Sequence, residues 1–132
     1  MPTELFWLTA TTVLTGLMWI LYILDRFLVR GLMGTLDNPS RDAPPQSGWA
    51  MRLYVAHTNA VENLVVFAIL VFILQDLDIS SRATMWACAV YFWARLAHAI
   101  VYTLGIPVVR TLAFLTGFGA EVVLVLAIFK VL

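Results

Sequence analysis

Four long apolar segments alternate with short polar ones along this chain of 132 residues. The first, from Leu5 to Leu24, contains no charged residue and has about the 20 residues that an α-helix needs to cross a hydrocarbon core of roughly 30 Å. We expect membrane spans over residues 4–30, 49–75, 82–104 and 107–130. The pattern predicts an all-α membrane protein: a four-transmembrane-helix antiparallel bundle that forms a single domain over residues 1–132.

Turn-forming residues separate the expected spans. The first span ends at Gly31, which leads into a polar, proline-containing loop over residues 37–45. The connection over residues 76–81 is short and polar, so the second and third spans are expected to be antiparallel neighbours. Gly105 suits the position just after a helix, and Pro107 suits the first position of the next one.

Composition agrees with a membrane protein and excludes a nucleic-acid binder. The chain is 62% hydrophobic with a mean hydropathy of +0.92, and only 12% of its residues are charged, against about a quarter in soluble domains. Its net charge is zero and it has no basic run, so the electrostatic footprint of a nucleic-acid partner is missing. With one cysteine, Cys88, it has no intrachain disulfide and no cysteine-based metal pattern.

Arginines are distributed unevenly between the two ends of the predicted bundle. Short loops rich in lysine and arginine stay in the cytoplasm. The opposite end has only Arg82 and Lys130, so we expect both termini to face away from the cytoplasm. Five arginines lie at the first and third connections: Arg26, Arg30, Arg41, Arg52 and Arg110.

Ionisable side chains inside the apolar segments are functional-site candidates, because each costs several kcal/mol in a bilayer unless it is paired or hydrated. At about 100° per residue, Arg52, Asn59 and Glu62 share one face of the second span. By the same geometry, Arg95, His98 and Tyr102 form a stripe on the third span. The candidates are Arg52, Glu62, Arg95, His98 and Glu121.

The depths of these residues suggest a pairing. Counted from a turn near Asp78, Glu62 and Arg95 are about level, and so are Asn59 and His98. We therefore expect an ion pair between Glu62 and Arg95, extended by Asn59 and His98. The same pair could also serve only to lock the bundle, since a buried ion pair is a weak indicator of anything further.

Two further polar residues are left open. Glu121 has no obvious partner, so it is either protonated or in contact with another subunit. His57 points away from the polar face of its span, and a hydrogen-bonding role is expected for it. The chain has only two histidines and no acidic cluster beside them, so no metal site is expected.

The segment from Arg52 to Asn63 resembles the signature of the MAPEG family, the membrane-associated proteins of eicosanoid and glutathione metabolism. It reads R-x-x-x-A-H-x-N-x-x-E-N with matching spacing. Arg30 ahead of Asn38-Pro39, the stripe of the third span, and the segment from Gly105 to Arg110 also agree with the family. The resemblance covers nearly the whole chain and is to prokaryotic-type members, which implies the plasma membrane of a prokaryote.

The resemblance implies a homotrimer with three glutathione sites between subunits, open toward the cytoplasm. Glutathione carries two carboxylates and one ammonium group, for which arginines and a carboxylate are suitable partners. Arg110 is the residue expected to stabilise the glutathione thiolate, with the Thr111 hydroxyl as a donor to the sulfur. A small lipophilic electrophile would arrive from the lipid. By similarity, the glutathione-binding residues are Arg30, Arg52, Asn59, Glu62, Arg95, His98 and Tyr102.

Three departures from the family pattern affect the expected activity. Val55 and Thr58 stand where glutathione-using relatives often have arginines, so glutathione should bind more weakly. Phe114 stands where several active members have tyrosine. The implied function is a membrane-bound glutathione-dependent transferase or peroxidase. The alternative is a non-catalytic lipid-binding scaffold or an accessory subunit of a membrane complex.

Overall fold

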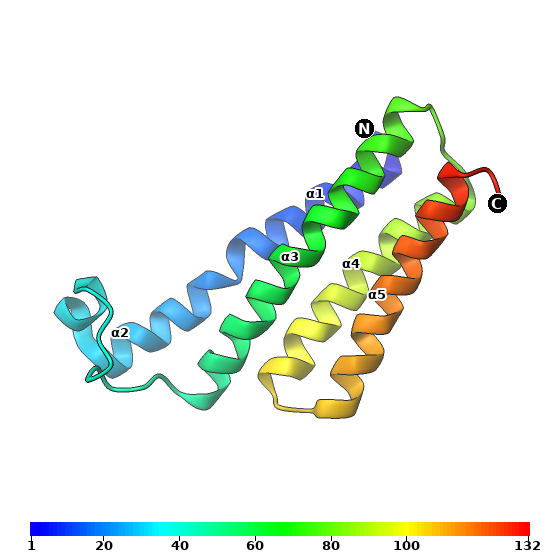
Figure 1. The fold of residues 1–132 in the computed structure, drawn as a ribbon. Helices are drawn as coiled ribbons and strands as arrows, with labels where there is room; N and C mark the ends of the chain where they lie inside the picture. The colour runs from blue at the N-terminus through cyan, green and yellow to red at the C-terminus, as the bar shows by residue number, and fades with distance from the viewer.

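The chain folds into helices and connections only. A computed structural model describes residues 1–132 and contains α1 (Thr3–Leu17), α2 (Trp19–Leu36), α3 (Gly48–Asp76), α4 (Arg82–Thr103) and α5 (Pro107–Ile128). Met18, between the first two, keeps helical dihedral angles (φ −61°, ψ −30°), so α1 and α2 continue as one long rod. The four rods run up and down side by side (Figure 1). The all-α prediction is confirmed.

Three of the rods have the length and apolar composition needed to cross a membrane. They are Thr3–Leu36, Gly48–Asp76 and Pro107–Ile128. The fourth rod, α4, is of similar length to α5 but is more polar, since it contains Arg95 and His98 in its second half. The structure thus supports a membrane protein with three candidate spans beside one more polar helix.

Glycine sets two of the helix ends. Gly31 has φ +72° and ψ 178°, a conformation that residues with a side chain rarely adopt, and it breaks α2 one turn before its end. Gly105 has φ +78°, and its N–H donates to the Tyr102 carbonyl while the N–H of Ile106 donates to the Val101 carbonyl, both at 3.0 Å. This pair of bonds closes α4, and Pro107 then begins α5. The predicted roles of Gly105 and Pro107 are confirmed.

The opposite end of the bundle, which holds both chain termini (Figure 1), is fastened by a buried carboxylate. Ser81 and Thr84 form a reciprocal capping box at the start of α4. The Oε1 atom of Glu4 in α1 accepts hydrogen bonds from the Thr84 hydroxyl at 2.6 Å and the Ser80 hydroxyl at 2.8 Å. Because Glu4 is fully buried, these bonds tie α1 to α4 where water cannot compete.

The core has two parts of different character. The terminal core, near the chain termini, contains larger side chains such as Leu74 and Leu124, and in it Phe67 stacks on Tyr91 with ring centroids 3.9 Å apart. Cys88 is buried there among them. The alanine-rich core, toward the other end, consists of Met18, Tyr22, Ala50, Leu53, Ala56, Ala60 and Ala99. Its small side chains let the helix backbones approach closely.

Candidate functional site

Polar side chains gather at the end of the bundle opposite the chain termini. The start of α3, the end of α4 and the start of α5 lie at this end, and the loop after α2 leads into α3 on the far side from the α4–α5 turn (Figure 1). One hydrogen bond among these side chains joins α3 to α4: Nη2 of Arg95 donates to Oδ1 of Asn59 at 2.6 Å. Arg95 is 4% exposed and its Nε has no partner, so Asn59 provides the only hydrogen bond to this guanidinium within the chain.

The predicted ion pair between Glu62 and Arg95 is wrong for this chain taken alone. No arginine or lysine nitrogen lies within 4.0 Å of a carboxylate oxygen, and Glu62 is exposed. The buried stripe of α3 runs through Leu53, Ala56 and Ala60. Glu62 lies about 200° around the helix from Ala60, so it faces away from the bundle. Matching depth was therefore insufficient, because helix rotation decides which residue meets α4.

The stripe predicted on α4 continues into α5. His98 is 4% exposed, its Nδ1 has no partner, and its ring lies 5.4 Å from that of Tyr102. The Arg110 guanidinium carbon lies 4.5 Å from the centroid of the Tyr102 ring, which is cation–π geometry. No carboxylate pairs with Arg110, so its positive charge is held in place by an uncharged aromatic ring. The ring of Phe114 borders this group, 6.4 Å from His98.

Glu121 has neighbours within its own chain. It lies on α5, 7% exposed, close enough to Arg95 and Tyr91 of α4 for their charges and dipoles to interact. The carboxylate is still more than 4.0 Å from any cationic nitrogen, and its Oε1 has no hydrogen-bond partner. Asn59 is thus the hydrogen-bond partner of Arg95, while Glu121 of α5 lies in its vicinity without a hydrogen bond to it.

Arg52 joins the start of α3 to the end of α4. Its Nε donates to the Thr103 carbonyl at 2.9 Å, one of the last carbonyls of α4, which lack partners inside the helix. A positive charge at this position is favourable because it meets the negative end of the helix dipole. A Cβ atom on Gly105 would lie 3.4 Å from the Arg52 Nε, so the absence of a side chain there leaves space for the guanidinium.

Arg30 lies apart from Arg95, His98, Tyr102 and Arg110, which we call the α4–α5 group. Its Nε donates to the Pro44 carbonyl at 2.8 Å. It lines a cavity of about 410 Å³ between α2, the loop and α3, which we call the arginine pocket. Arg26 and Arg41 also line this pocket, and Val55 lies at its α3 side. The valine thus lies beside three arginines.

Sequence reasoning did not single out Asp25, which shapes the arginine pocket. This carboxylate is 4% exposed and accepts bonds from the Ser47 N–H at 3.0 Å, the Ser47 hydroxyl at 2.6 Å and the Gln46 amide at 3.4 Å. Gln46 in turn accepts from Arg26 at 3.2 Å. A lone acid next to Arg26, directly after the first apolar segment, was the available signal. His57, as expected, has a hydrogen-bonding role, since its Nδ1 lies 2.7 Å from the Tyr22 hydroxyl.

Thr111, the predicted donor to a sulfur, is exposed on the first turn of α5. Its hydroxyl donates to the Pro107 carbonyl at 3.3 Å. This is a long bond within the helix, so reorienting the hydroxyl toward a ligand would sacrifice little.

The predicted site residues therefore fall into three places in one chain. The α4–α5 group holds Arg95, His98, Tyr102 and Arg110, and two α3 residues contact α4 beside it, Asn59 through Arg95 and Arg52 through the Thr103 carbonyl. Arg30 lies in the arginine pocket, and Glu62 and Thr111 face outward.

Comparison with known proteins agrees with the resemblance. The model of the MAPEG family matches residues 5–130, nearly the whole chain. No curated protein and no solved structure matches. Because the family model covers the four rods and all the residues of the site, the chain belongs to the MAPEG family.

Proposed function

We propose that this protein is a membrane-bound glutathione-dependent transferase or peroxidase that acts on small lipophilic electrophiles. Family membership supports a glutathione-related membrane function in general. The specific proposal is that Arg110 stabilises the thiolate of bound glutathione, which then attacks the electrophile. Arg30, Arg52, Asn59, Glu62, Arg95, His98 and Tyr102 would hold the rest of the tripeptide.

The observation that carries this proposal is the state of Arg110. A thiol ionises with a pKa of about 8.5 in water, and an adjacent positive charge lowers that value. Arg110 has no carboxylate partner, and Tyr102 orients its guanidinium without neutralising it. A cation that is fixed but uncompensated is what a thiolate site requires. The Thr111 hydroxyl, one residue on, would be a second donor to the sulfur.

Assembly as a homotrimer is the second part of the proposal. Glu62 lies midway along α3 and faces outward, where lipid contact would cost several kcal/mol. A second copy packed on this face would cover Glu62. We propose that the glutathione sites lie at such interfaces between subunits.

We also propose that α4 crosses the membrane, giving four spans. Its contact with α5 is the most extensive between any two helices, and the two run alongside each other for their full length (Figure 1). Since α5 is long and apolar enough to span, its partner would cross with it. The arginine-rich end would then face the cytoplasm and both termini the opposite side.

The test is a titration of the detergent-solubilised protein with glutathione, followed by the ultraviolet absorbance of the thiolate. The wild type should show a saturable thiolate signal, and Arg110→Ala should bind glutathione but lose that signal. Arg82→Ala is the matched control, because Arg82 is exposed at the other end of α4. If the wild type shows neither binding nor thiolate, the enzyme proposal is wrong.

The second candidate, a non-catalytic lipid-binding scaffold or accessory subunit, is favoured by Val55 and Phe114. Val55 is 46% exposed and adds no charge to the arginine pocket, and Phe114 brings no hydroxyl to His98. Under this reading Glu62→Gln dissociates the trimer, while glutathione fails to protect any variant against unfolding. Retained glutathione binding in a dissociated Glu62→Gln protein would instead assign Glu62 to assembly alone.

A further inference from the structure

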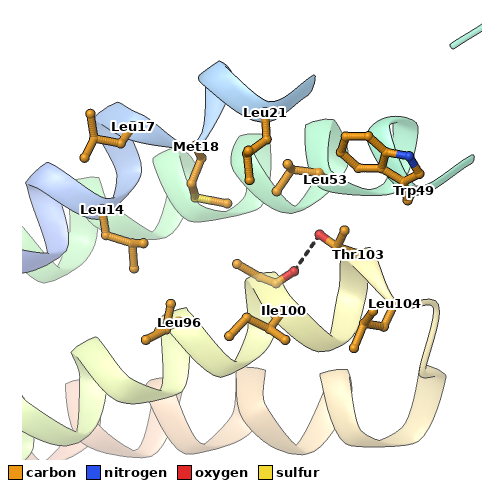
Figure 2. Close-up of a pocket in the computed structure, with 11 residues that line it drawn as sticks. Leu14, Leu17, Met18, Leu21, Trp49, Leu53, Leu96, Ile100, Thr103 and Leu104 are labelled. Carbon is orange, nitrogen blue, oxygen red and sulfur yellow. Dashed lines mark hydrogen bonds between the residues drawn. The ribbon is translucent and has the colours of Figure 1, made fainter. Parts of the chain in front are cut away.

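A second cavity lies between the α1–α2 rod, α3 and α4, away from the α4–α5 group. It is a groove of about 420 Å³ in which ten of the eleven lining residues are hydrophobic, among them Leu14, Met18, Leu53 and Ile100 (Figure 2). The remaining one, Thr103, donates its hydroxyl to the Ala99 carbonyl at 2.7 Å, so it offers the groove no free donor. The wall is therefore apolar throughout and suits a hydrocarbon.

The groove has a definite length and depth. On α4 it runs from Leu96 to Leu104, a rise of about 12 Å at 1.5 Å per residue. One leaflet of a bilayer has a hydrocarbon depth of about 15 Å, half of the whole core. The groove thus covers most of one leaflet, and it ends where α4 ends, at the arginine-rich face of the bundle.

A positive charge, that of Arg52, lies beside one end of the groove. Trp49 and Leu104 lie at this end and Leu14 at the other (Figure 2). Arg52 binds the carbonyl of Thr103, a groove residue, through its Nε alone. Its two terminal nitrogens make no hydrogen bond in the chain, and the residue as a whole is half-buried. A half-buried cation with free donors at the mouth of an apolar slot complements an anion attached to a chain.

We propose that this groove binds one acyl chain of an anionic phospholipid from the leaflet at the arginine-rich end, with the lipid phosphate on Arg52. The acyl chain fills the apolar length of the groove. The phosphate accepts hydrogen bonds from the terminal nitrogens of Arg52, at the depth where head groups begin. The same guanidinium is among those that the proposed function gives to glutathione, so the two anions would compete for Arg52, and the lipid experiment is therefore run without glutathione.

The experiment uses the full-length protein in vesicles that contain a phosphatidylglycerol with a photoreactive group on its acyl chain. After irradiation, adducts are mapped by mass spectrometry. Labelling should concentrate on residues 96–104 and 14–21 rather than on the exposed face of α5. A phosphatidylcholine with the same acyl chain should label these segments about fivefold less. Attraction of one arginine to an anionic head group is expected to change the binding constant by about this factor. Arg52→Gln should abolish that preference while the chain still labels the groove.

Two variants test the groove itself. Ile100→Trp and Leu17→Trp fill it from opposite walls at positions that are 51% and 55% exposed, so neither disturbs the core. Each should reduce labelling of the groove to the level on α5, whereas Leu112→Trp on α5 should leave it unchanged. Equal labelling of all faces would overturn the proposal. Crosslinks from groove residues to a second copy of the chain would also overturn it, because a neighbouring subunit would then be the occupant.

Discussion

The hydrogen bond between Asn59 and Arg95 predicts that replacing Asn59 destabilises the protein more than replacing Glu62 does. From the sequence alone, which favours Glu62 as the partner of Arg95, the opposite order is expected. Asn59→Leu removes the acceptor 2.6 Å from a guanidinium that is 4% exposed and whose Nε already lacks a partner. A hydrogen bond to a charged group contributes about 1.5–3 kcal/mol in soluble proteins, and polar contacts in bilayers average about 0.6 kcal/mol. Because Arg95 has no other hydrogen bond in the chain, we expect the free energy of unfolding to fall by about 2 kcal/mol.

The assay is reversible unfolding in mixed micelles with increasing sodium dodecyl sulfate, followed by circular dichroism. Thr58→Val is the matched control, since Thr58 is exposed on the same helix and bonds only to Tyr54 of its own turn. It should change the free energy of unfolding by less than about 0.5 kcal/mol. The result that refutes this reasoning is an Asn59→Leu variant as stable as the control together with a Glu62→Gln variant whose free energy of unfolding falls by about 2 kcal/mol or more. Glu62, and not Asn59, would then be the partner of Arg95.

Three further predictions follow from the helix ends and the arginine pocket. Gly105→Ala places a Cβ atom on a residue with φ +78° and should lower the free energy of unfolding by about 1 kcal/mol. Gly119→Ala, in the middle of α5 with open space around it, should raise the free energy of unfolding by up to about 1 kcal/mol. Thermal denaturation of the two variants measures both effects. Glu4→Ala removes the acceptor that ties α1 to α4 and should speed hydrogen exchange at the start of α4, while Glu4→Gln, which keeps a carbonyl oxygen there, should have a smaller effect. Val55→Arg adds a cation to the arginine pocket and should tighten glutathione binding about fivefold by calorimetry, an effect that Val55→Gln must not reproduce.

The helix ends were predictable because their signals are local. Gly105 followed by Pro107 specifies a turn through properties of two residues, a permissive backbone and a missing N–H, and the structure has that turn. Gly31 likewise breaks its helix where the sequence predicted a span to end. Such signals need no knowledge of how helices are rotated against one another.

The partner of Arg95 was not predictable in this way. The depths of Glu62 and Asn59 differ by less than one turn, and an opposite charge favours Glu62. Only the buried stripe through Ala56 and Ala60 fixes the rotation of α3, and it turns Asn59 toward α4 and Glu62 outward. Choosing that stripe requires knowing where the neighbouring helices lie, which one sequence does not contain.

Glu4 and Asp25 show a second kind of limit. Both lie at the margins of apolar segments, where an acid is ordinarily solvated. In the structure both carboxylates are buried, and each accepts hydrogen bonds from hydroxyl or N–H groups of distant segments. Their partners, Thr84 and Ser47, are separated from them by 80 and 22 residues. A small polar residue at a helix start is common, so nothing in the sequence marked these two as the matching donors.

The contrast between the two cores has a consequence for motion. The terminal core is interlocked by stacked and branched side chains, and Glu4 fastens it from α1. Four of the seven residues of the alanine-rich core are alanines, and beyond it a single hydrogen bond, from Arg52 to Thr103, joins the start of α3 to the end of α4. Local opening should therefore be graded along the bundle, with fast amide exchange at the arginine-rich end and slow exchange at the other. Bound molecules could then enter and leave through one end by its breathing, while the opposite end keeps the helices in register.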